Sequence, residues 1–272
     1  MAPHRLRRIA HGRMAEVFEW GEGTVVKLYR PEVPRERVHH EHKATQLAGA
    51  AGLPVPAVHD IVEHEGRVGI VFERITGTSL LQRLEDKPWT LRGGARLLAG
   101  LQQEVNDRSG EGLPARRDEL RTEIAASGLP ADVIATLHVR LAGMPDGDRL
   151  VHGDFHPDNV ILTRSGPVII DWADATCGDP LVDVVRTRLL LELGEIPAAG
   201  TRRRVVAVGR SLFAATYMSR VRRLRQPSVD QLDAWAPFAA AGRLAEKISS
   251  ERDELLTIVH RGLQESTRRH AH

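Results

Sequence analysis

Acidic and amide side chains follow two apolar runs in the second half of the chain. The run at 150–151 is followed by Asp154 and Asn159, and the run at 168–170 ends directly at Asp171. Asp154 and Asn159 are five positions apart, the separation used in kinases between the carboxylate that orients an attacking hydroxyl and a metal-binding amide. A carboxylate directly after a buried strand, as at Asp171, suits Mg²⁺, which prefers oxygen ligands. These residues predict transfer of a phosphoryl group from a nucleotide to a hydroxyl.

A lysine and a glutamate near the amino terminus fit the same chemistry. Lys27 stands in a short β-branched run that is typical of a strand, and an Ala-rich helical pattern follows at 34–52. Glu41 lies on the apolar stripe of that helix, so it is expected to face inward. An unpaired buried carboxylate is costly, and Lys27 would supply the partner in the lysine–glutamate pair that kinases require. Glu36 is the competing glutamate.

Several short motifs carry a family resemblance: His152-Gly153-Asp154 with Asn159, Ile170-Asp171-Trp172, and Gly178-Asp179-Pro180 with Asp183. Together they resemble the aminoglycoside phosphotransferase and choline-kinase-like superfamily of small-molecule kinases. The resemblance is densest over 150–190 and weaker over 8–82. It implies an α+β, bilobal protein-kinase-like fold, with a small N-terminal antiparallel sheet, one main helix and a larger, mostly helical C-terminal lobe.

The resemblance also implies a domain order and a nucleotide site. Residues 1–73 would form the nucleotide-binding lobe, 74–80 the hinge, and 81–272 the catalytic and substrate-binding lobe. The donor would be ATP, with GTP as the other possibility. Lys27 would contact its phosphates, and main-chain groups of Glu73 and Ile75 would bond the purine. A complete Gly-x-Gly-x-x-Gly turn is absent from the first strands, where Gly12 stands alone.

Within the catalytic motifs, the resemblance assigns a separate role to each residue. Asp154 would orient the acceptor hydroxyl and accept its proton, while Asn159 and Asp171 would bind Mg²⁺. Asp183 would hydrogen-bond the backbone of the catalytic loop from the start of a helix. His152 would brace that loop without taking part in proton transfer.

A metallohydrolase is the competing class of enzyme for the same loop. His152, Asp154, His156 and Asp158 alternate, and imidazole with carboxylate would suit zinc, manganese or iron. Such a hydrolase has no need of a strand lysine and a helix glutamate far upstream. The presence of Lys27 and Glu41 therefore favours the kinase.

The spacing after Asp171 indicates a small substrate. Asp179 follows Asp171 by eight positions, which is too short for the platform on which protein kinases hold a peptide. From Leu181 onward, 16 Lys and Arg stand against 10 Asp and Glu, which disfavours a strongly cationic acceptor. An antibiotic-resistance kinase acting on an aminoglycoside, macrolide or peptide antibiotic remains an alternative, as does a catalytically silent nucleotide-binding regulator.

Composition predicts a cytoplasmic enzyme, a monomer or weak dimer without a membrane or nucleic-acid partner. The 272 residues are 42% hydrophobic, no apolar run is long enough to cross a membrane, and Cys177 as the single cysteine excludes an internal disulfide. Basic clusters at 202–204 and 220–225 raise a nucleic-acid hypothesis. The net charge of +2 and an aromatic content of 4% disfavour it.

The carboxy-terminal third is expected to be helical, over 181–194, 200–224, 229–248 and 250–268, with breaks at glycine and proline. In the second of these helices the expected buried stripe consists of Val205, Val206, Val208, Leu212 and Ala215. The neighbouring arginines are then expected on exposed helix faces.

Overall fold

The structure is a computed structural model that describes residues 6–194 and 200–269. The chain forms two compact units. The first consists of the residues up to Gln82 together with 158–175, and the second of 83–157 together with the residues from Thr176 onward. The sequence places 158–175 in the carboxy-terminal lobe, whereas here it packs with the first unit. The lobe limits at 73 and 80 stay a prediction.

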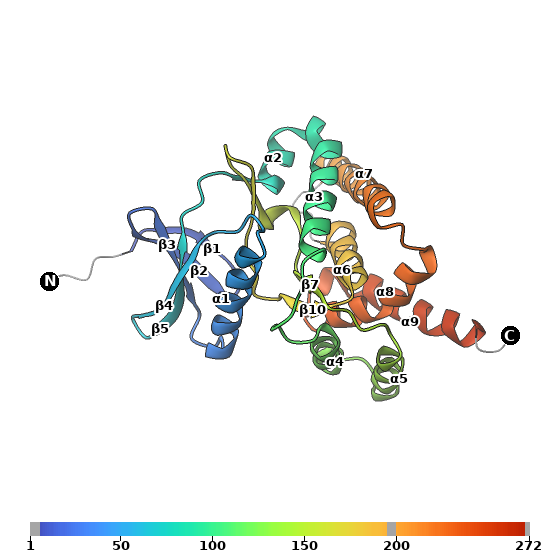
Figure 1. The fold of residues 1–272 in the computed structure, drawn as a ribbon. Coiled ribbons are helices and arrows are strands. Elements are labelled where there is room, and N and C mark those ends of the chain that lie inside the picture. Colours follow the sequence, from blue (N-terminus) through green and yellow to red (C-terminus); the bar gives the residue numbers. More distant parts are fainter. Residues whose placement is uncertain (1–5, 195–199, 270–272) are drawn as a thin grey trace. The chain divides into compact units, whose positions relative to one another are not determined.

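An antiparallel sheet and one helix make up most of the first unit (Figure 1). The sheet order is β1-β2-β3-β5-β4, with β1 Arg8–His11, β2 Ala15–Gly21, β3 Thr24–Tyr29, β4 Val58–His64 and β5 Arg67–Glu73. The helix α1, Arg35–Ala50, covers one face, where Val38 packs with Tyr29, Ile70 and Phe72. Gly23 has a φ of 69°, which permits the tight turn between β2 and β3.

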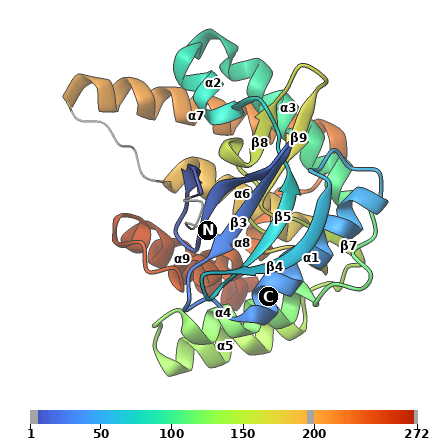
Figure 2. The same cartoon turned by 90° about the vertical axis from the view of Figure 1, so that its left-hand side faces the viewer.

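A second, three-stranded sheet completes the first unit. Its order is β6-β8-β9, with β6 Thr78–Ser79, β8 Val160–Leu162 and β9 Pro167–Ile169, and Figure 2 shows the β8–β9 hairpin. In the hairpin, Val160 pairs with Ile169, and the Ile170 N–H donates to the Asn159 carbonyl at 3.0 Å. The hairpin register therefore places Asn159 opposite the residue that precedes Asp171.

Helices around a short pair of strands form the second unit. The strands β7, Arg149–Val151, and β10, Thr176–Gly178, are antiparallel. The helices are α2 Leu80–Asp86, which starts at the end of the first unit, α3 Leu91–Asn106, α4 Arg116–Ala126, α5 Ala131–Ala142, α6 Pro180–Leu193, α7 Gly200–Arg225, α8 Val229–Leu244 and α9 Arg252–Arg269. The N-cap of α6 is Asp179, whose side chain accepts from the Leu181 N–H at 2.8 Å, and Pro180 occupies the first turn.

The α+β architecture expected from the sequence is confirmed: an N-terminal antiparallel sheet with one main helix precedes a mainly helical remainder. The described helices include none that is long and apolar enough to cross a membrane.

The buried face of α7 differs from the expected stripe. Its buried side chains are Phe213, Ala214, Tyr217, Met218 and Val221. Val208 and Leu212 are 69% and 39% exposed, and Ala215 is exposed as well, so the expected stripe was wrong by about half a turn. The side chain of Val205 lies outside the described residues. The aromatic residues decide the orientation because they bury more apolar surface than valine or alanine.

The fold makes a prediction about a buried ion pair in the second unit. Arg243 donates to both Glu251 oxygens, at 2.7 and 2.8 Å, and the two side chains are 8% and 1% exposed. Glu251→Ala would leave the buried guanidinium with Glu246 as its remaining carboxylate partner, at a cost of about 3 kcal/mol. Urea-induced unfolding measures this loss. The matched control is Glu192→Ala, whose pair with Arg188 is exposed and is expected to contribute less than about 1 kcal/mol. Equal losses in the two variants would contradict the prediction.

Candidate active site

The Lys27 ammonium on β3 is enclosed by carboxylates. Its Nζ donates to both oxygens of Glu41, at 2.8 and 2.9 Å, and to Oδ1 of Asp171 at 2.8 Å. An ammonium has three donors, and these three oxygens use all of them. Burial alone would lower the pKa of Lys27, but the charges of Glu41 and Asp171 outweigh burial and raise it above its ordinary value. The lysine is therefore fixed in position and positively charged.

Glu41 is buried on α1 at the point where the apolar stripe faces the sheet. It is 1% exposed, and its neighbours on the stripe are Val38, Ala44, Thr45 and Ala48. Glu36 is on the exposed face of the same helix, so the structure brings Glu41 rather than Glu36 to Lys27. Burial raises the pKa of the Glu41 carboxyl, and the hydrogen bonds from Lys27 act in the opposite direction.

Tyr29 is a further member of this cluster that the sequence did not reveal. Its hydroxyl donates to Glu41, and its side chain is buried beneath the sheet. Burial and the Glu41 charge both raise the pKa of Tyr29, so the hydroxyl stays protonated and remains a donor. Tyr29 stands two positions after Lys27, so the two side chains start on the same face of β3. That spacing was the available signal.

Asn159 and Asp171 flank the β8–β9 hairpin at the same end. Asp171 has a φ of 64°, in the left-handed region that aspartate tolerates better than most residues. Its side chain is 42% exposed, in contrast to the buried Glu41, and it is the more accessible of the two carboxylates that hold Lys27. Three positions later, Asp174 accepts from Arg37 of α1 and ties this segment to the helix.

In the second unit, Asp154 belongs to a loop whose backbone N–H groups donate to a buried carboxylate on α6. Asp183 on α6 accepts from the His152 N–H at 3.2 Å and from the Gly153 N–H at 3.0 Å. Asn106 of α3 donates to the same Asp183 carboxylate at 3.0 Å. Asp183 is 1% exposed, and the expectation that it supports the loop backbone is confirmed.

Arg186 is a second support for this loop, and the sequence analysis missed it. Its Nε donates to the Gly153 carbonyl, and its Nη2 pairs with Glu246 at 2.8 Å. Arg186 stands three positions after Asp183 on α6, so both side chains start on one face of the helix. The i, i+3 spacing was the only sequence signal, and it is not specific.

The Asp154 carboxylate is kept ionised by its surroundings. Burial would raise its pKa, but a contact of 3.3 Å from His156 Nε2 and the Arg186 charge outweigh burial and hold the pKa of Asp154 well below its usual value. A carboxylate that is ionised near neutral pH can orient a hydroxyl by accepting its hydrogen bond.

The histidines of the loop are not arranged as a metal site. His152 is fully buried, and its Nδ1 accepts from the Asp154 N–H at 3.3 Å. Within 6–194 and 200–269, no group of three or more His, Cys, Asp or Glu residues is positioned to hold a metal ion. This geometry gives the metallohydrolase alternative no support.

The two expected hinge residues, Glu73 and Ile75, differ in whether the main-chain N–H group already forms a hydrogen bond within the described chain. The Glu73 N–H already donates to the Ala57 carbonyl at 2.8 Å. In the described part of the chain, the main chain of Ile75 forms no hydrogen bond. The Ile75 N–H therefore remains open to a ligand, and Glu73 could contribute only its carbonyl.

The lysine cluster predicts a pH-dependent loss of stability in Lys27→Met. The substitution leaves Glu41 buried without its cation, so its folded-state pKa stays above the unfolded value and stability falls as pH rises through that range. The variant is expected to be less stable than the parent by about 3 kcal/mol at pH near 8 and by less at pH near 5. Chemical denaturation at both pH values measures the gap.

The matched control is the double variant Lys27→Met with Glu41→Gln. It carries no ionisable group at position 41, so its gap to the parent should not shrink at the lower pH. A Lys27→Met gap that stays constant with pH would mean that Glu41 is not the group responsible.

A family model described as the phosphotransferase enzyme family matches residues 5–204. A comparison with curated proteins found no match. One solved structure is a thermostable mutant of the aminoglycoside phosphotransferase APH(4)-Ia in complex with AMP-PNP and hygromycin B. It is 18% identical, with 95% of this chain and 92% of that chain covered and a TM-score of 0.62.

Two further solved structures share the fold. The GDP complex of an aminoglycoside 2'-phosphotransferase mutant is 16% identical, with 98% of this chain and 92% of that chain covered and a TM-score of 0.59. A choline/ethanolamine kinase family protein from Mesorhizobium loti is 16% identical, with 97% and 88% covered and a TM-score of 0.55. At these identities the likeness establishes the fold, and the protein-kinase-like fold expected from the sequence is confirmed. Because the matched family model spans most of the sequence, the chain belongs to the phosphotransferase enzyme family and is a small-molecule kinase.

Proposed function

We propose that this kinase transfers the γ-phosphate of ATP to a hydroxyl group of a small molecule. The observation that carries the proposal is the Lys27 ammonium, which is held by Glu41 and Asp171 from two other parts of the chain. Asp171 is 42% exposed although it pairs with a largely buried lysine, and a kinase needs such an accessible carboxylate to bind metal.

The phosphate-binding role falls to Lys27. Glu41 is the buried partner and holds the ammonium in place, while the more exposed Asp171 is the partner that can exchange its contact with Lys27 for other ligands. The Lys27 donor thus released would point at phosphate oxygens. This division explains why one carboxylate is buried with a tyrosine and the other is accessible.

The residues present fit a magnesium ion. Asn159 and Asp171 lie at one end of the β8–β9 hairpin and offer amide and carboxylate oxygens, the donors that Mg²⁺ prefers. When bound, the ion would neutralise charge on the phosphates. Asn159 and Asp171 are the two residues that we assign to it.

Asp154 is the proposed catalytic residue. Its lowered pKa keeps it ionised, so it would accept a hydrogen bond from the acceptor hydroxyl and receive the proton as the new oxygen–phosphorus bond forms. His156 would stabilise this ionised form, and Asp183 and Arg186 would fix the loop backbone.

ATP is the proposed donor, with GTP as the alternative. The open Ile75 N–H and the Glu73 carbonyl would bond the edge of the purine, and main-chain groups of this kind discriminate weakly between the two bases. The enzyme is proposed to work in the cytoplasm on a small molecule, as a monomer or weak dimer. The net charge of +2 supports the absence of a nucleic-acid partner.

A kinase that modifies an antibiotic is the second candidate. The likeness to a structure solved with hygromycin B favours it. The basic balance after Leu181 counts against a polycationic acceptor, and Glu251, one of the acidic residues there, is already bonded to Arg243. A nucleotide-consumption screen over antibiotics, sugars, amino alcohols and nucleosides, with an Asp154→Asn blank, distinguishes the candidates. Turnover confined to antibiotics would establish the second candidate, whereas turnover of no compound in the screen would favour the silent regulator.

Asp171→Ala is expected to abolish the magnesium dependence of nucleotide binding, because it removes the only carboxylate among the two residues assigned to the ion. Calorimetric titration with ATP, with and without Mg²⁺, measures the effect. Asp174→Ala is the matched control, since Asp174 stands three positions away and pairs with Arg37. ATP affinity that still rises with Mg²⁺ in Asp171→Ala would show that the ion is held elsewhere.

Asp154→Asn is expected to lower turnover by about 10²–10⁴-fold while ATP affinity stays within about twofold of the parent. The amide can keep the loop geometry but cannot accept a proton. Steady-state kinetics on an accepted substrate gives kcat, and calorimetry gives the affinity. A variant that retains most of its turnover would remove Asp154 from the catalytic role.

A further inference from the structure

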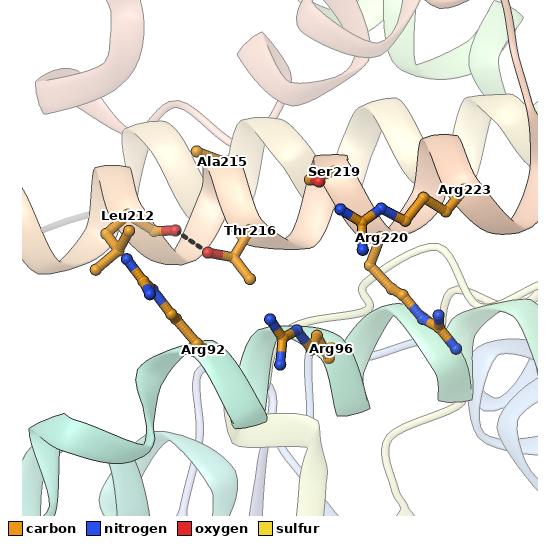
Figure 3. A pocket seen from close by; sticks show the side chains of 8 residues that line it. All are labelled: Arg92, Arg96, Leu212, Ala215, Thr216, Ser219, Arg220 and Arg223. Atoms are coloured by element: carbon orange, nitrogen blue, oxygen red, sulfur yellow. Dashed lines mark hydrogen bonds between the residues drawn. The ribbon is translucent and has the colours of Figure 1, made fainter.

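A groove between α3 and α7 gathers positive charge within the second unit. It has a volume of about 300 Å³ and is lined by Arg92, Arg96, Leu212, Ala215, Thr216, Ser219, Arg220 and Arg223 (Figure 3). Figure 3 shows Arg92 and Arg96 rising from α3 toward α7, and Arg220 reaching back toward α3. None of the lining residues is acidic.

The guanidinium groups of this groove have no protein partner in the described part of the chain, unlike the buried and half-buried arginines of the unit. Arg186, Arg243 and Arg225 all form hydrogen bonds or ion pairs. Among the described residues, the side chains of the four groove arginines form no hydrogen bond and no ion pair. Four cations therefore share a small space without a neutralising carboxylate.

The α7 side of the groove adds two hydroxyl groups, on Thr216 and Ser219, and two apolar side chains, Leu212 and Ala215. The Thr216 hydroxyl donates to the Leu212 carbonyl at 2.7 Å and keeps its lone pairs, whereas the Ser219 hydroxyl has no partner within the described chain. Leu212 and Ala215 are the exposed residues of α7 that the sequence had placed in the core. These two side chains offer little apolar surface for an apolar ligand.

We propose that this groove binds a small molecule carrying two or more clustered phosphate groups. Guanidinium groups bind phosphate with paired, charge-assisted hydrogen bonds, and four of them match more than one phosphate. Binding would also relieve the mutual repulsion of the arginines. The site is distinct from the proposed catalytic residues, since none of Lys27, Asn159, Asp154 or Asp171 lines it.

The size and composition of the groove favour a small ligand over nucleic acid. The lining contains no aromatic side chain on which a base could stack, and stacking is a usual feature of single-strand binding. A volume of about 300 Å³ lies at the lower end of small-molecule sites. A polyphosphate of two or three units matches that space and charge.

The test uses inorganic tripolyphosphate without magnesium as the probe, titrated calorimetrically into the full chain at low ionic strength, where screening is weak. The variant is Arg96→Gln with Arg220→Gln, which removes one cation from each helix and keeps hydrogen-bonding groups. The matched control is Arg222→Gln, an exposed arginine on α7 that does not line the groove. Probe bound at the proposed nucleotide site is common to all three proteins, so the difference between the two variants reports on the groove.

The expected result is binding that falls about tenfold or more in the double variant and less than about twofold in Arg222→Gln, because a charge-assisted hydrogen bond contributes about one power of ten in affinity. Equal losses in both variants, unchanged binding in the double variant, or no binding to the parent would each overturn the proposal. So would an oligonucleotide that binds the groove more tightly than tripolyphosphate. None of these results depends on turnover, so the proposal of a phosphate-binding groove can be rejected without affecting the proposed kinase activity.

Discussion

The first unit is organised around a single buried cation. The Lys27 ammonium needs oxygen partners because a charge removed from water is costly unless it is paired. One partner comes from α1 and the other from a loop 144 positions further along the chain. The sheet, the helix and the β8–β9 hairpin must therefore all be in place before the charge is satisfied. Because the cluster can form only in the folded chain, its members contribute to stability together, and the same cluster holds the lysine that we propose binds phosphate.

The two carboxylates around Lys27 are not equivalent. Glu41 is enclosed by the apolar stripe of α1 and hydrogen-bonded by Tyr29, so it has no route to another ligand. Asp171 is 42% exposed and stands at a strained backbone position after a strand. Strain of this kind persists only where surrounding structure enforces it, and it is common at functional sites. The chain thus separates a fixed positioning residue from one that can exchange partners.

The loop that carries Asp154 depends on contacts from α6 and α3. Asp183 accepts hydrogen bonds from two backbone N–H groups of the loop, and Arg186 donates to a loop carbonyl. Asn106 donates to the same Asp183 carboxylate. Each of these supports is nearly inaccessible to solvent, where an unsatisfied polar group would be expensive. A loop whose backbone donors and acceptors are both hydrogen-bonded holds Asp154 in place, as the role that we propose for it requires.

In the sequence by itself, the family resemblance of the short motifs indicated the fold class, and apolar periodicity indicated the position of most elements and the choice of Glu41, because both are local properties that the chain displays directly. It also indicated Asp183, whose spacing within a motif is fixed. It did not reveal Tyr29 or Arg186, whose contacts join residues that carry no shared motif, and it placed the buried face of α7 incorrectly. Helical periodicity defines a stripe but not which side of a helix is covered. On α7 that was decided by the packing of Phe213 and Tyr217, including the hydrogen bond from the Tyr217 hydroxyl to Gln102 of α3. The exposed stripe that results, and the arginines that meet across it, exist only in the tertiary structure, because α3 and α7 are distant in sequence and become neighbours only on folding.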